Sequence, residues 1–297
     1  MRIIVTGASG LVGTALVPYL RAEGHEIARL VRSREESSDA IYWDPDAGEL
    51  NPDELSGFDA IVHLAGANVA AGRWTAKRKR LILESRVNGL RTLTEAVRRC
   101  SERPTIMISA SATGFYGHRD DEVLDETSES GSGFLAKVCQ EWEGGLREVE
   151  SLGLRTVSLR LGIVLSGNGG ALRKMLPAFR CGLGGRLGSG QQWMSWISET
   201  DLVRVVQHVL EANTIRGPVN AVSPEPVTSA VFTEKLALVL RRPAVLPVPA
   251  FILRILFGQM ADEALLASAR VKPQLLQAAG FSFTHERLES ALRDVLQ

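Results

Sequence analysis

Three glycines near the start of the chain have the spacing of a phosphate-binding turn. Gly7, Gly10 and Gly13 stand between a short apolar run at 3–6 and a stretch at 11–22 with apolar residues at helical spacing. In such a turn the first glycine permits the tight bend, the second lets backbone approach a pyrophosphate, and the third lets the helix pack closely. The helix N-terminus adds free N–H groups and a positive dipole end. We therefore predict a dinucleotide site that uses Thr6, Gly7, Ser9, Gly10, Leu11, Val12 and Gly13, with a plain structural turn as the alternative.

Residues at the end of the next predicted strand indicate which dinucleotide the site would bind. Arg32 follows Gly13 by 19 positions, where an NAD-binding protein carries an acidic residue for the ribose hydroxyls. An arginine removes that acceptor and offers a fork that matches a 2′-phosphate. Arg32 and its neighbour Ser33 therefore favour NADP(H) over NAD, and a solvated charged turn that includes Arg34 is the alternative.

Further cofactor contacts are expected where later strands end. Trp43 and Asp44 follow a weak third strand and are candidates to reach an adenine. A glycine at a strand's carboxyl end lets backbone lie against a cofactor in the crevice of an open sheet. The remaining candidates are Leu64, Ala65 and Gly66, then Ser109, and finally Gly162 and Val164 behind a nicotinamide. We interpret His63, which lies in an apolar run, as a packed core histidine.

The elements that must position these residues alternate along the first two-thirds of the chain. Short runs rich in β-branched residues at 3–6, 26–31, 60–65, 105–109 and 155–161 are separated by helix-like stretches at 11–22, 75–100 and 134–152. This alternation predicts an α/β fold, a Rossmann-type doubly wound parallel sheet covered on both faces, with a smaller, mostly helical C-terminal lobe. We place the dinucleotide-binding domain at 1–165, with part of 190–225 returning to it. The substrate lobe spans 166–297 and includes a helical domain at about 245–297.

The composition excludes several classes of protein. The chain has 297 residues, of which 45% are hydrophobic, and its 34 basic and 34 acidic residues balance to a net charge of zero. That composition argues against disorder, and the balance disfavours nucleic-acid or membrane partners, with a local charged patch as the alternative. Cys100, Cys139 and Cys181 lack disulfide or metal-ligand spacing, and we expect all three to be buried. No segment has the length of a membrane span or the pattern of an export signal, so a cytoplasmic location is predicted.

The glycine spacing of three and three resembles the short-chain dehydrogenase/reductase superfamily, and further motifs narrow the resemblance. Together they resemble the epimerase-family atypical members of the 39U type, over essentially the whole chain. The motifs are Gly-Ala-Asn (66–68), Arg-Trp-Thr (73–75), Ser-Arg-Val (85–87), Ser-Ala-Ser-Ala-Thr-Gly-Phe-Tyr-Gly (109–117), Phe-Leu-Ala (134–136), Trp-Glu (142–143), Arg-Leu-Gly (160–162), Gly-Ser-Gly (188–190), Trp-Ile (196–197), Asp-Leu (201–202) and Arg-Val-Lys-Pro (270–273). The resemblance implies an NADP(H)-binding oxidoreductase or epimerase with a short C-terminal domain.

The chemistry of the superfamily depends on a Ser, Tyr and Lys trio. Ser111 matches the serine, which polarises a substrate carbonyl, and Thr113 is the nearby alternative. The Tyr-x-x-x-Lys pair is missing, because Gly133 stands four residues before Lys137. Tyr116 is a candidate proton donor from the loop after the fifth strand, or a buried tyrosine that anchors that loop.

The glycine-rich segment at 166–190 and the residues after it are expected to bind the substrate. Lys174, Gln191 and Trp193 are the candidates. The leading hypothesis is an NADP(H)-dependent oxidoreductase or epimerase-like enzyme for a small carbonyl or hydroxyl substrate. The alternatives are a non-catalytic NADPH-binding sensor or partner protein, and a sugar-nucleotide epimerase with a second basic pocket from Lys174, Arg180 and Arg186. A homodimer through helices 75–100 and 134–152 is left open beside a monomer.

Overall fold

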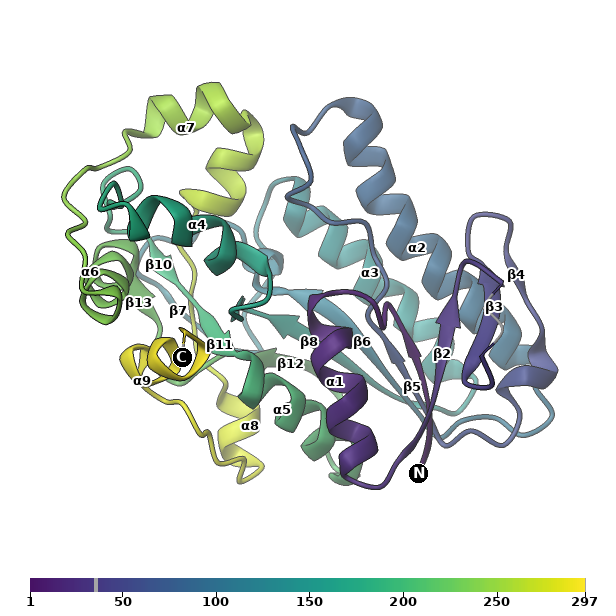
Figure 1. Ribbon diagram of the computed structural model, residues 1–297. Coiled ribbons are helices and arrows are strands. Elements are labelled where there is room, and N and C mark those ends of the chain that lie inside the picture. The colour runs from purple at the N-terminus through teal and green to yellow at the C-terminus, as the bar shows by residue number, and fades with distance from the viewer. Residues whose placement is uncertain (35–36, 297) are drawn as a thin grey trace.

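A twisted eight-stranded sheet forms the centre of the molecule in the computed structural model, which describes residues 1–34 and 37–296 (Figure 1). The strand order is β12-β8-β6-β5-β1-β2-β3-β4, and every neighbouring pair is parallel except β3 and β4. The strands are β1 (Arg2–Thr6), β2 (Glu26–Val31), β3 (Ala40–Asp44), β4 (Glu49–Leu50), β5 (Ala60–His63), β6 (Ile106–Ala112), β8 (Arg155–Leu161) and β12 (Gly217–Ala221). The order reverses at β1 and β5, and in open α/β sheets a ligand binds outside the carboxyl ends of the strands at such a point.

Helices cover both faces of this sheet, as the alternating pattern predicts. One face packs against α1 (Leu11–Ala22) and α5 (Glu199–Glu211), and the other against α2 (Ala76–Arg99) and α3 (Phe134–Ser151). Each layer has its own apolar core, because a strand buried on both faces alternates its side chains between the two. The Rossmann-type doubly wound fold is therefore confirmed.

The rest of the chain builds a smaller, mostly helical lobe beside the carboxyl ends of the strands (Figure 1). Its helices are α4 (Gly170–Arg180), α6 (Ser229–Leu240), α7 (Ala250–Phe257), α8 (Gln274–Ala278) and α9 (Leu288–Leu296). Three small pairs of strands accompany them: β9 (Ile163–Leu165) with β11 (Trp196–Ser198), β10 (Trp193–Met194) with β13 (Val227–Thr228), and β7 (Val123–Leu124) with β14 (Arg270–Val271). The last pair joins the lobe to the loop that follows β6.

The structure differs from the sequence-based expectations in the exposure of one cysteine and in two short strands that were not predicted. Cys100 and Cys139 are buried, whereas Cys181 is exposed, because it caps the carboxyl end of α4 at the surface. The strands β9 and β11, which pair with each other, could not be recognised in the sequence, because three residues are too few to show an alternating pattern.

Among the residues that the structure describes, none of the helices has the length and apolar character needed to span a bilayer.

Candidate functional site

The turn between β1 and α1 has the geometry that its glycines predict. The Gly10 N–H donates to the Gly7 carbonyl at 2.9 Å, and Gly7 has a positive φ of +68°. A Cβ added to Gly7 would lie 2.8 Å from the backbone nitrogen of Ala65, so the turn packs directly against the end of β5. A side chain at position 7 would push these two segments apart.

Gly13 is the most crowded glycine of this turn. A Cβ there would lie 2.3 Å from the Gly7 carbonyl oxygen and 2.6 Å from Cα of Ala8. Both obstacles are backbone, which has no rotamer through which to move. The third glycine therefore lets α1 begin directly on the turn, so that the N–H groups of its first residues point into the space above the sheet.

Thr6 ties the ends of β1 and β5 together beneath the turn. Its buried hydroxyl oxygen accepts hydrogen bonds from the N–H groups of Leu64 and Ala65, both at 3.1 Å, and lies 2.8 Å from His63 Nδ1. The hydroxyl proton is thus directed to Nδ1, which leaves the ring proton on Nε2. His63 has no solvent exposure and lies edge-on to Trp43 and Trp142, which confirms its interpretation as a core histidine.

The burial of His63 predicts an acid-sensitive fold. Desolvation, with a smaller contribution from Arg86, lowers its pKa to about 3. In the unfolded chain the pKa is about 6.5, so the unfolded state binds the extra proton between these values. The stabilisation is complete above about pH 6.5 and is lost as the pH falls toward 3. We expect His63→Asn to remove about 1.4 kcal/mol per pH unit from the slope of unfolding free energy against pH in this window.

Urea unfolding at a series of pH values measures that slope. His118→Asn, at a side chain that is 56% exposed, is the comparison for the loss of an imidazole from the surface. Equal slopes for the wild type and His63→Asn would contradict the prediction.

The turn opens onto a cleft of about 780 Å³ at the carboxyl ends of β1, β2 and β5. Nine of the predicted cofactor residues line it: Gly7, Ser9, Gly10, Arg32, Ser33, Trp43, Leu64, Ala65 and Gly66. They come from four separate segments that only the sheet brings together. The topology predicts this crevice, and its lining is a backbone-rich turn beside the almost fully buried Trp43.

The other predicted cofactor residues lie outside the lining of this cleft. Asp44 makes a local turn, where its carboxylate accepts the N–H groups of Asp46 and Ala47. Gly162 packs against β11, and a Cβ there would lie 2.7 Å from the Ser195 carbonyl oxygen. The full set outside the lining is Thr6, Leu11, Val12, Gly13, Asp44, Ser109, Gly162 and Val164.

Several residues that line the cleft were not predicted from the sequence. Asn68, Arg78, Leu81 and Ser85 come from the loop after β5 and from the first turns of α2. Arg78 donates to the Asn68 carbonyl through one guanidinium nitrogen, while its Nε is buried without a partner among the described residues. A cation with an unsatisfied donor at the lining of the cleft is suited to a phosphate group. No local signal marks Arg78, because it is one of several basic residues in an amphipathic helix.

Three arginines near the end of β2 differ in the side chains that they contact. Arg29 binds Asp39 at 2.8 Å, and hydrogen bonds from Arg29 hold the pKa of that carboxyl well below its usual range. Arg34 lies over the ring of Tyr42, 4.8 Å from its centroid. Arg32 is exposed at the rim of the cleft, and no ion pair joins it to any carboxylate in the described part of the chain. The structure therefore leaves Arg32 available to an incoming anion.

Ser111 and Tyr116, two of the three predicted catalytic residues, lie in a buried polar network. The Ser111 hydroxyl donates to Glu143 at 2.6 Å, and Glu143 forms an ion pair with Arg160 at 2.8 Å. Tyr116 has no solvent exposure, and its hydroxyl contacts the Asp125 carbonyl, the Asn220 side chain and Arg160. Burial raises the pKa of Tyr116.

The tyrosine therefore anchors its loop, which is the structural alternative that the sequence left open, and its hydroxyl has no path to a ligand in this conformation. Thr113 begins the one-turn helix η2 (Thr113–Tyr116) and is partly exposed.

The face of α3 that meets this region carries neither a phenol nor an amine. Leu135 packs on Gly114, where a Cβ would lie 3.2 Å from that of Leu135, and the Cys139 thiol contacts the Ala112 carbonyl at 3.7 Å. Burial raises the pKa of Cys139 to about 11, so the thiol stays protonated. Lys137, in contrast, is exposed. The pair four residues apart that faces the sheet is thus Leu135 and Cys139, and not Gly133 and Lys137.

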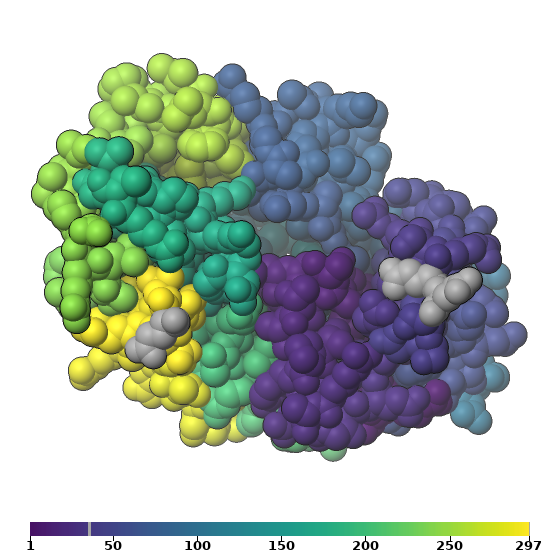
Figure 2. All heavy atoms as spheres, in the orientation of Figure 1, coloured from purple at the N-terminus to yellow at the C-terminus, as the bar shows by residue number. Residues whose placement is uncertain are grey.

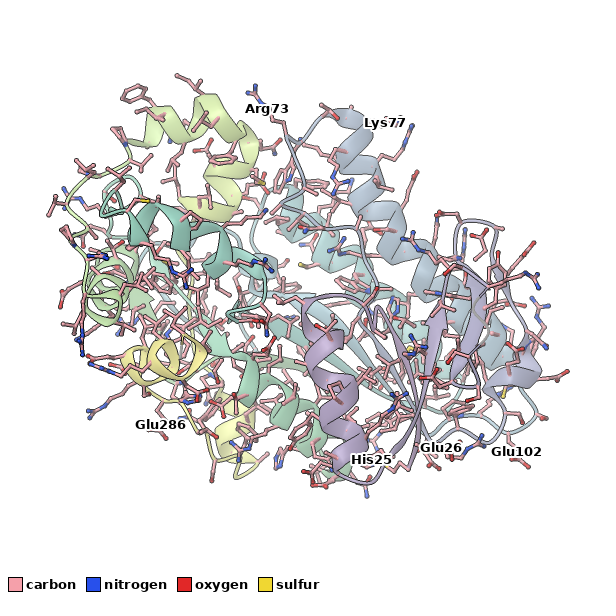
Figure 3. All side chains as sticks on the ribbon, in the orientation of Figure 1. His25, Glu26, Arg73, Lys77, Glu102 and Glu286 are labelled. Carbon is pink, nitrogen blue, oxygen red and sulfur yellow. The ribbon has the colours of Figure 1, made fainter. Side chains whose placement is uncertain are left out.

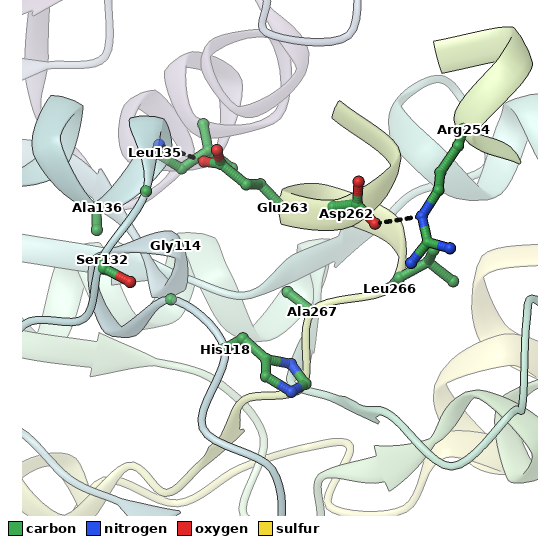
Figure 4. Close-up of a pocket in the computed structure, with 12 residues that line it drawn as sticks. Gly114, His118, Ser132, Leu135, Ala136, Arg254, Asp262, Glu263, Leu266 and Ala267 are labelled. Carbon is green, nitrogen blue, oxygen red and sulfur yellow. Dashed lines mark hydrogen bonds and ion pairs between the residues drawn. The ribbon is translucent and has the colours of Figure 1, made fainter. Parts of the chain in front are cut away.

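A second cavity, of about 400 Å³, lies where the start of α3 meets the C-terminal lobe (Figure 4). The Glu263 carboxylate enters from the lobe and accepts the Leu135 N–H at 2.8 Å. Gly133, with φ of +109°, makes room for it, because a Cβ there would lie 3.0 Å from the carboxylate. Arg254 and Asp262 form an ion pair at the rim.

His118 lies at the opposite wall of this cavity (Figure 4). Its Nδ1 accepts the backbone N–H of Ser268 at 3.0 Å, which places the proton of the neutral ring on Nε2, 2.9 Å from Asp120. The cavity thus holds a carboxylate and an imidazole, the two side-chain types that most often serve as general acids and bases.

The residues predicted to bind the substrate lie elsewhere. Lys174 donates to the Ala70 carbonyl at 3.1 Å, Gln191 is exposed, and the Trp193 indole donates to Asp121 at 2.7 Å. None of the three lines either cavity. The sequence missed Glu263 and His118 because they are separated by more than a hundred residues and only the packing of the lobe brings them to one cavity.

Comparisons with known proteins agree with this architecture. Residues 3–221 match the "NAD dependent epimerase/dehydratase family", and residues 248–295 match a "Domain of unknown function (DUF1731)". An epimerase family protein of Mycobacterium bovis is 42% identical over 290 residues, which cover 98% of this chain and 96% of that one. A chloroplastic epimerase family protein of Arabidopsis thaliana is 36% identical and matches the whole of this chain and 87% of its own length.

A solved structure extends the likeness to the whole fold. The crystal structure of the human epimerase family protein SDR39U1 (isoform 2) with NADPH superimposes with a TM-score of 0.90 at 32% identity, and the match covers 99% of each chain. A UDP-glucose 4-epimerase of Thermus thermophilus in complex with NAD has a TM-score of 0.76 at 21% identity, which shows a shared fold alone.

Proposed function

Because the chain belongs to the NAD dependent epimerase/dehydratase family, we propose that it is an NADP(H)-dependent oxidoreductase or epimerase-like enzyme for a small carbonyl or hydroxyl substrate. The observation that carries the proposal is the cleft of about 780 Å³, in which a glycine turn, a helix N-terminus and the exposed Arg32 converge. When bound, the nicotinamide would supply or accept the hydride.

The residues of the cleft fit such a cofactor. The turn at Gly7–Gly10 would hold the pyrophosphate, with the unsatisfied Nε of Arg78 as a further donor. Arg32 would bind the 2′-phosphate, and the adenosine would lie near Trp43 at the lining of the cleft. Support for NADP(H) also comes from the human relative, whose crystal structure is described with NADPH.

The substrate is proposed to bind in the second cavity, beside the start of α3. Proton transfer would fall to Glu263 or His118, because the Ser111 hydroxyl is directed to Glu143 and Tyr116 is buried. Thr113, the first residue of η2, is a further hydroxyl proposed to orient a carbonyl, and Ser132 is the hydroxyl in the lining of the cavity itself. Glu263 comes from the C-terminal lobe, so this part of the chain would contribute directly to the reaction.

The cofactor assignment predicts a selective effect of one arginine. We expect Arg32→Ala to weaken NADPH binding by about ten- to a hundredfold, because a charge-assisted contact worth about 1.5–3 kcal/mol is lost. NADH binding should stay unchanged, since NADH has no 2′-phosphate. Calorimetric titration of both cofactors measures this. Arg34→Ala is the control and should leave both affinities as they are. Equal weakening of both cofactors by Arg32→Ala would contradict the assignment.

The missing Tyr-x-x-x-Lys pair favours a second candidate function, a non-catalytic NADPH sensor. Consumption of NADPH with a panel of small carbonyl compounds distinguishes the two. For an enzyme we expect turnover with at least one compound, and Glu263→Gln or His118→Gln should slow it by about a hundredfold with NADPH affinity retained. Tight NADPH binding without turnover on any compound would support the sensor.

A further inference from the structure

An apolar surface on the C-terminal lobe is left uncovered. Six large apolar side chains of one segment are exposed, with fractions from 37% at Ile252 to 76% at Val245. Four of them occupy one face of α7, the helix at the outer edge of the molecule (Figure 1), while Leu253 of the same helix is buried. We call this surface the apolar ridge: Val245, Leu246, Phe251, Ile252, Ile255 and Leu256.

The ridge is held in place by the glycine-rich loop after α4. The Leu246 N–H donates to the Gly184 carbonyl at 3.2 Å, and the Val248 N–H donates to the Arg186 carbonyl at 2.9 Å. A Cβ at Gly185 would lie 1.7 Å from the Leu246 carbonyl oxygen, so the two segments are in direct contact. These contacts fix the backbone before α7, so the ridge has a defined conformation.

Basic residues predominate in the segments around the ridge, and the first acidic residues after α7 are Asp262, which pairs with Arg254, and Glu263. Residues 66–83, 166–198 and 241–261 contain twelve basic residues and no Asp or Glu, in a chain whose total charges balance. Contacts bring these segments together. Lys174 donates to Ala70, Lys79 contacts Gln259, and Arg73 reaches the Gly258 backbone just after α7.

Arg73 and Lys77 lie at the same edge of the molecule as α7 (Figure 3), and the surface view shows α7 and the start of α2 side by side there (Figure 2). We call six exposed cations of these segments the basic rim: Arg73, Lys77, Lys174, Arg186, Arg241 and Arg242. No rim residue forms an ion pair with a carboxylate in the described ranges, whereas Arg254 on α7 is neutralised by Asp262. The rim therefore offers unpaired charge around an apolar centre.

This combination distinguishes between occupants. A second copy of the chain would bring two basic rims together, and like charges across an interface oppose association. A nucleic acid would match the charge, but the ridge offers aliphatic side chains and one phenylalanine where single strands need stacking surfaces. An anionic bilayer matches both parts, because amphipathic helices bury aliphatic and aromatic residues at its interface while Lys and Arg contact its headgroups.

We propose that the apolar ridge and the basic rim form a site that docks the protein on the surface of an anionic lipid bilayer, with α7 parallel to the membrane plane. Phe251, Ile255 and Leu256 would enter the boundary between headgroups and acyl chains. The rim would contact the lipid phosphates. The site is independent of the cofactor cleft, since no residue of the ridge lines it.

Vesicle flotation with the full chain tests the proposal. We expect binding to phosphatidylcholine vesicles that contain about one third phosphatidylserine, and at least about tenfold weaker binding to pure phosphatidylcholine or at high salt. Phe251→Asp with Ile255→Asp should abolish binding, and Arg241→Glu with Arg242→Glu should weaken it about tenfold or more. Circular dichroism and the thermal unfolding midpoint show whether each variant is folded.

Matched controls are available on other parts of the surface. Val123→Asp replaces an apolar residue that is 54% exposed on β7, and Arg147→Glu with Arg216→Glu makes the same change in net charge on α3 and before β12. Both should bind vesicles like the wild type.

Three outcomes would overturn the proposal. The first is equal binding of wild type to neutral and anionic vesicles, and the second is an equal loss in the controls. The third is no vesicle binding at all. In that case a dimer that dissociates in the α7 variant, or retention on single-stranded nucleic acid, would assign the surface to one of the other occupants.

Discussion

Replacing Gly13 with alanine is expected to abolish NADPH binding and to lower the free energy of unfolding by about 3 kcal/mol. The added Cβ would lie 2.3 Å from the Gly7 carbonyl oxygen and 2.6 Å from Cα of Ala8. Because both atoms are backbone, α1 or the turn must shift, and the N–H groups that would meet the pyrophosphate move with them. Calorimetric titration and urea unfolding measure the two effects.

Gly144→Ala is the matched control for this substitution. Gly144 also lies inside a helix, α3, but is exposed, and no atom lies within 4 Å of its added Cβ. Alanine has the higher helix propensity, so this variant should gain up to about 1 kcal/mol with NADPH binding retained. Wild-type affinity in Gly13→Ala would show that the turn does not hold the cofactor.

Replacing Glu143 with glutamine should lower the free energy of unfolding by about 3–5 kcal/mol. The Glu143 side chain is 15% exposed and that of Arg160 only 5%, so the variant leaves a buried guanidinium without its counter-charge. Arg160 also contacts the Tyr116 hydroxyl at 2.9 Å and lies 3.5 Å from the centroid of the Phe115 ring. The substitution therefore affects the whole loop after β6. Urea unfolding of the two proteins measures the loss.

Two further variants test whether the cause is the unpaired charge. Glu95→Gln removes a carboxylate that pairs with Arg98 and Arg99 on the surface of α2, and it should cost at most about 1 kcal/mol. Replacing both Glu143 and Arg160 with methionine should recover part of the loss, because no buried charge then remains. A loss for Glu143→Gln as small as that for Glu95→Gln would contradict the interpretation.

The cofactor half of the site is more readable from the sequence than the substrate half. The turn at Gly7–Gly13 is a local structure, whose residues are neighbours in the chain and whose conformational demands are specific to glycine. Arg32 is likewise placed by counting from that turn. Glu263 and His118 carry no such pattern, since they meet through the docking of one lobe on another. Arg78 was missed for a similar reason, because its unsatisfied Nε is defined only by its surroundings.

The net charge of the chain does not reveal where its charged residues lie in the structure. The balance of 34 basic and 34 acidic residues disfavours anionic partners when it is taken over the whole chain. The structure gathers three segments that lack acidic residues around the exposed face of α7. A net charge of zero therefore coexists with a concentrated basic rim.

The sequence by itself determined the Rossmann-type sheet, its helices and the phosphate-binding turn, because periodicity and glycine spacing act over a few neighbouring residues. Only the tertiary structure decided the hydrogen-bond partners of Ser111 and Tyr116. The Ser111 hydroxyl donates to Glu143, and the Tyr116 hydroxyl donates to Asn220 and accepts from Arg160, from elements that lie up to about a hundred residues away. A hydroxyl in the sequence has the same chemistry wherever it stands, and whether it meets a ligand or a buried ion pair depends on what the fold packs against it.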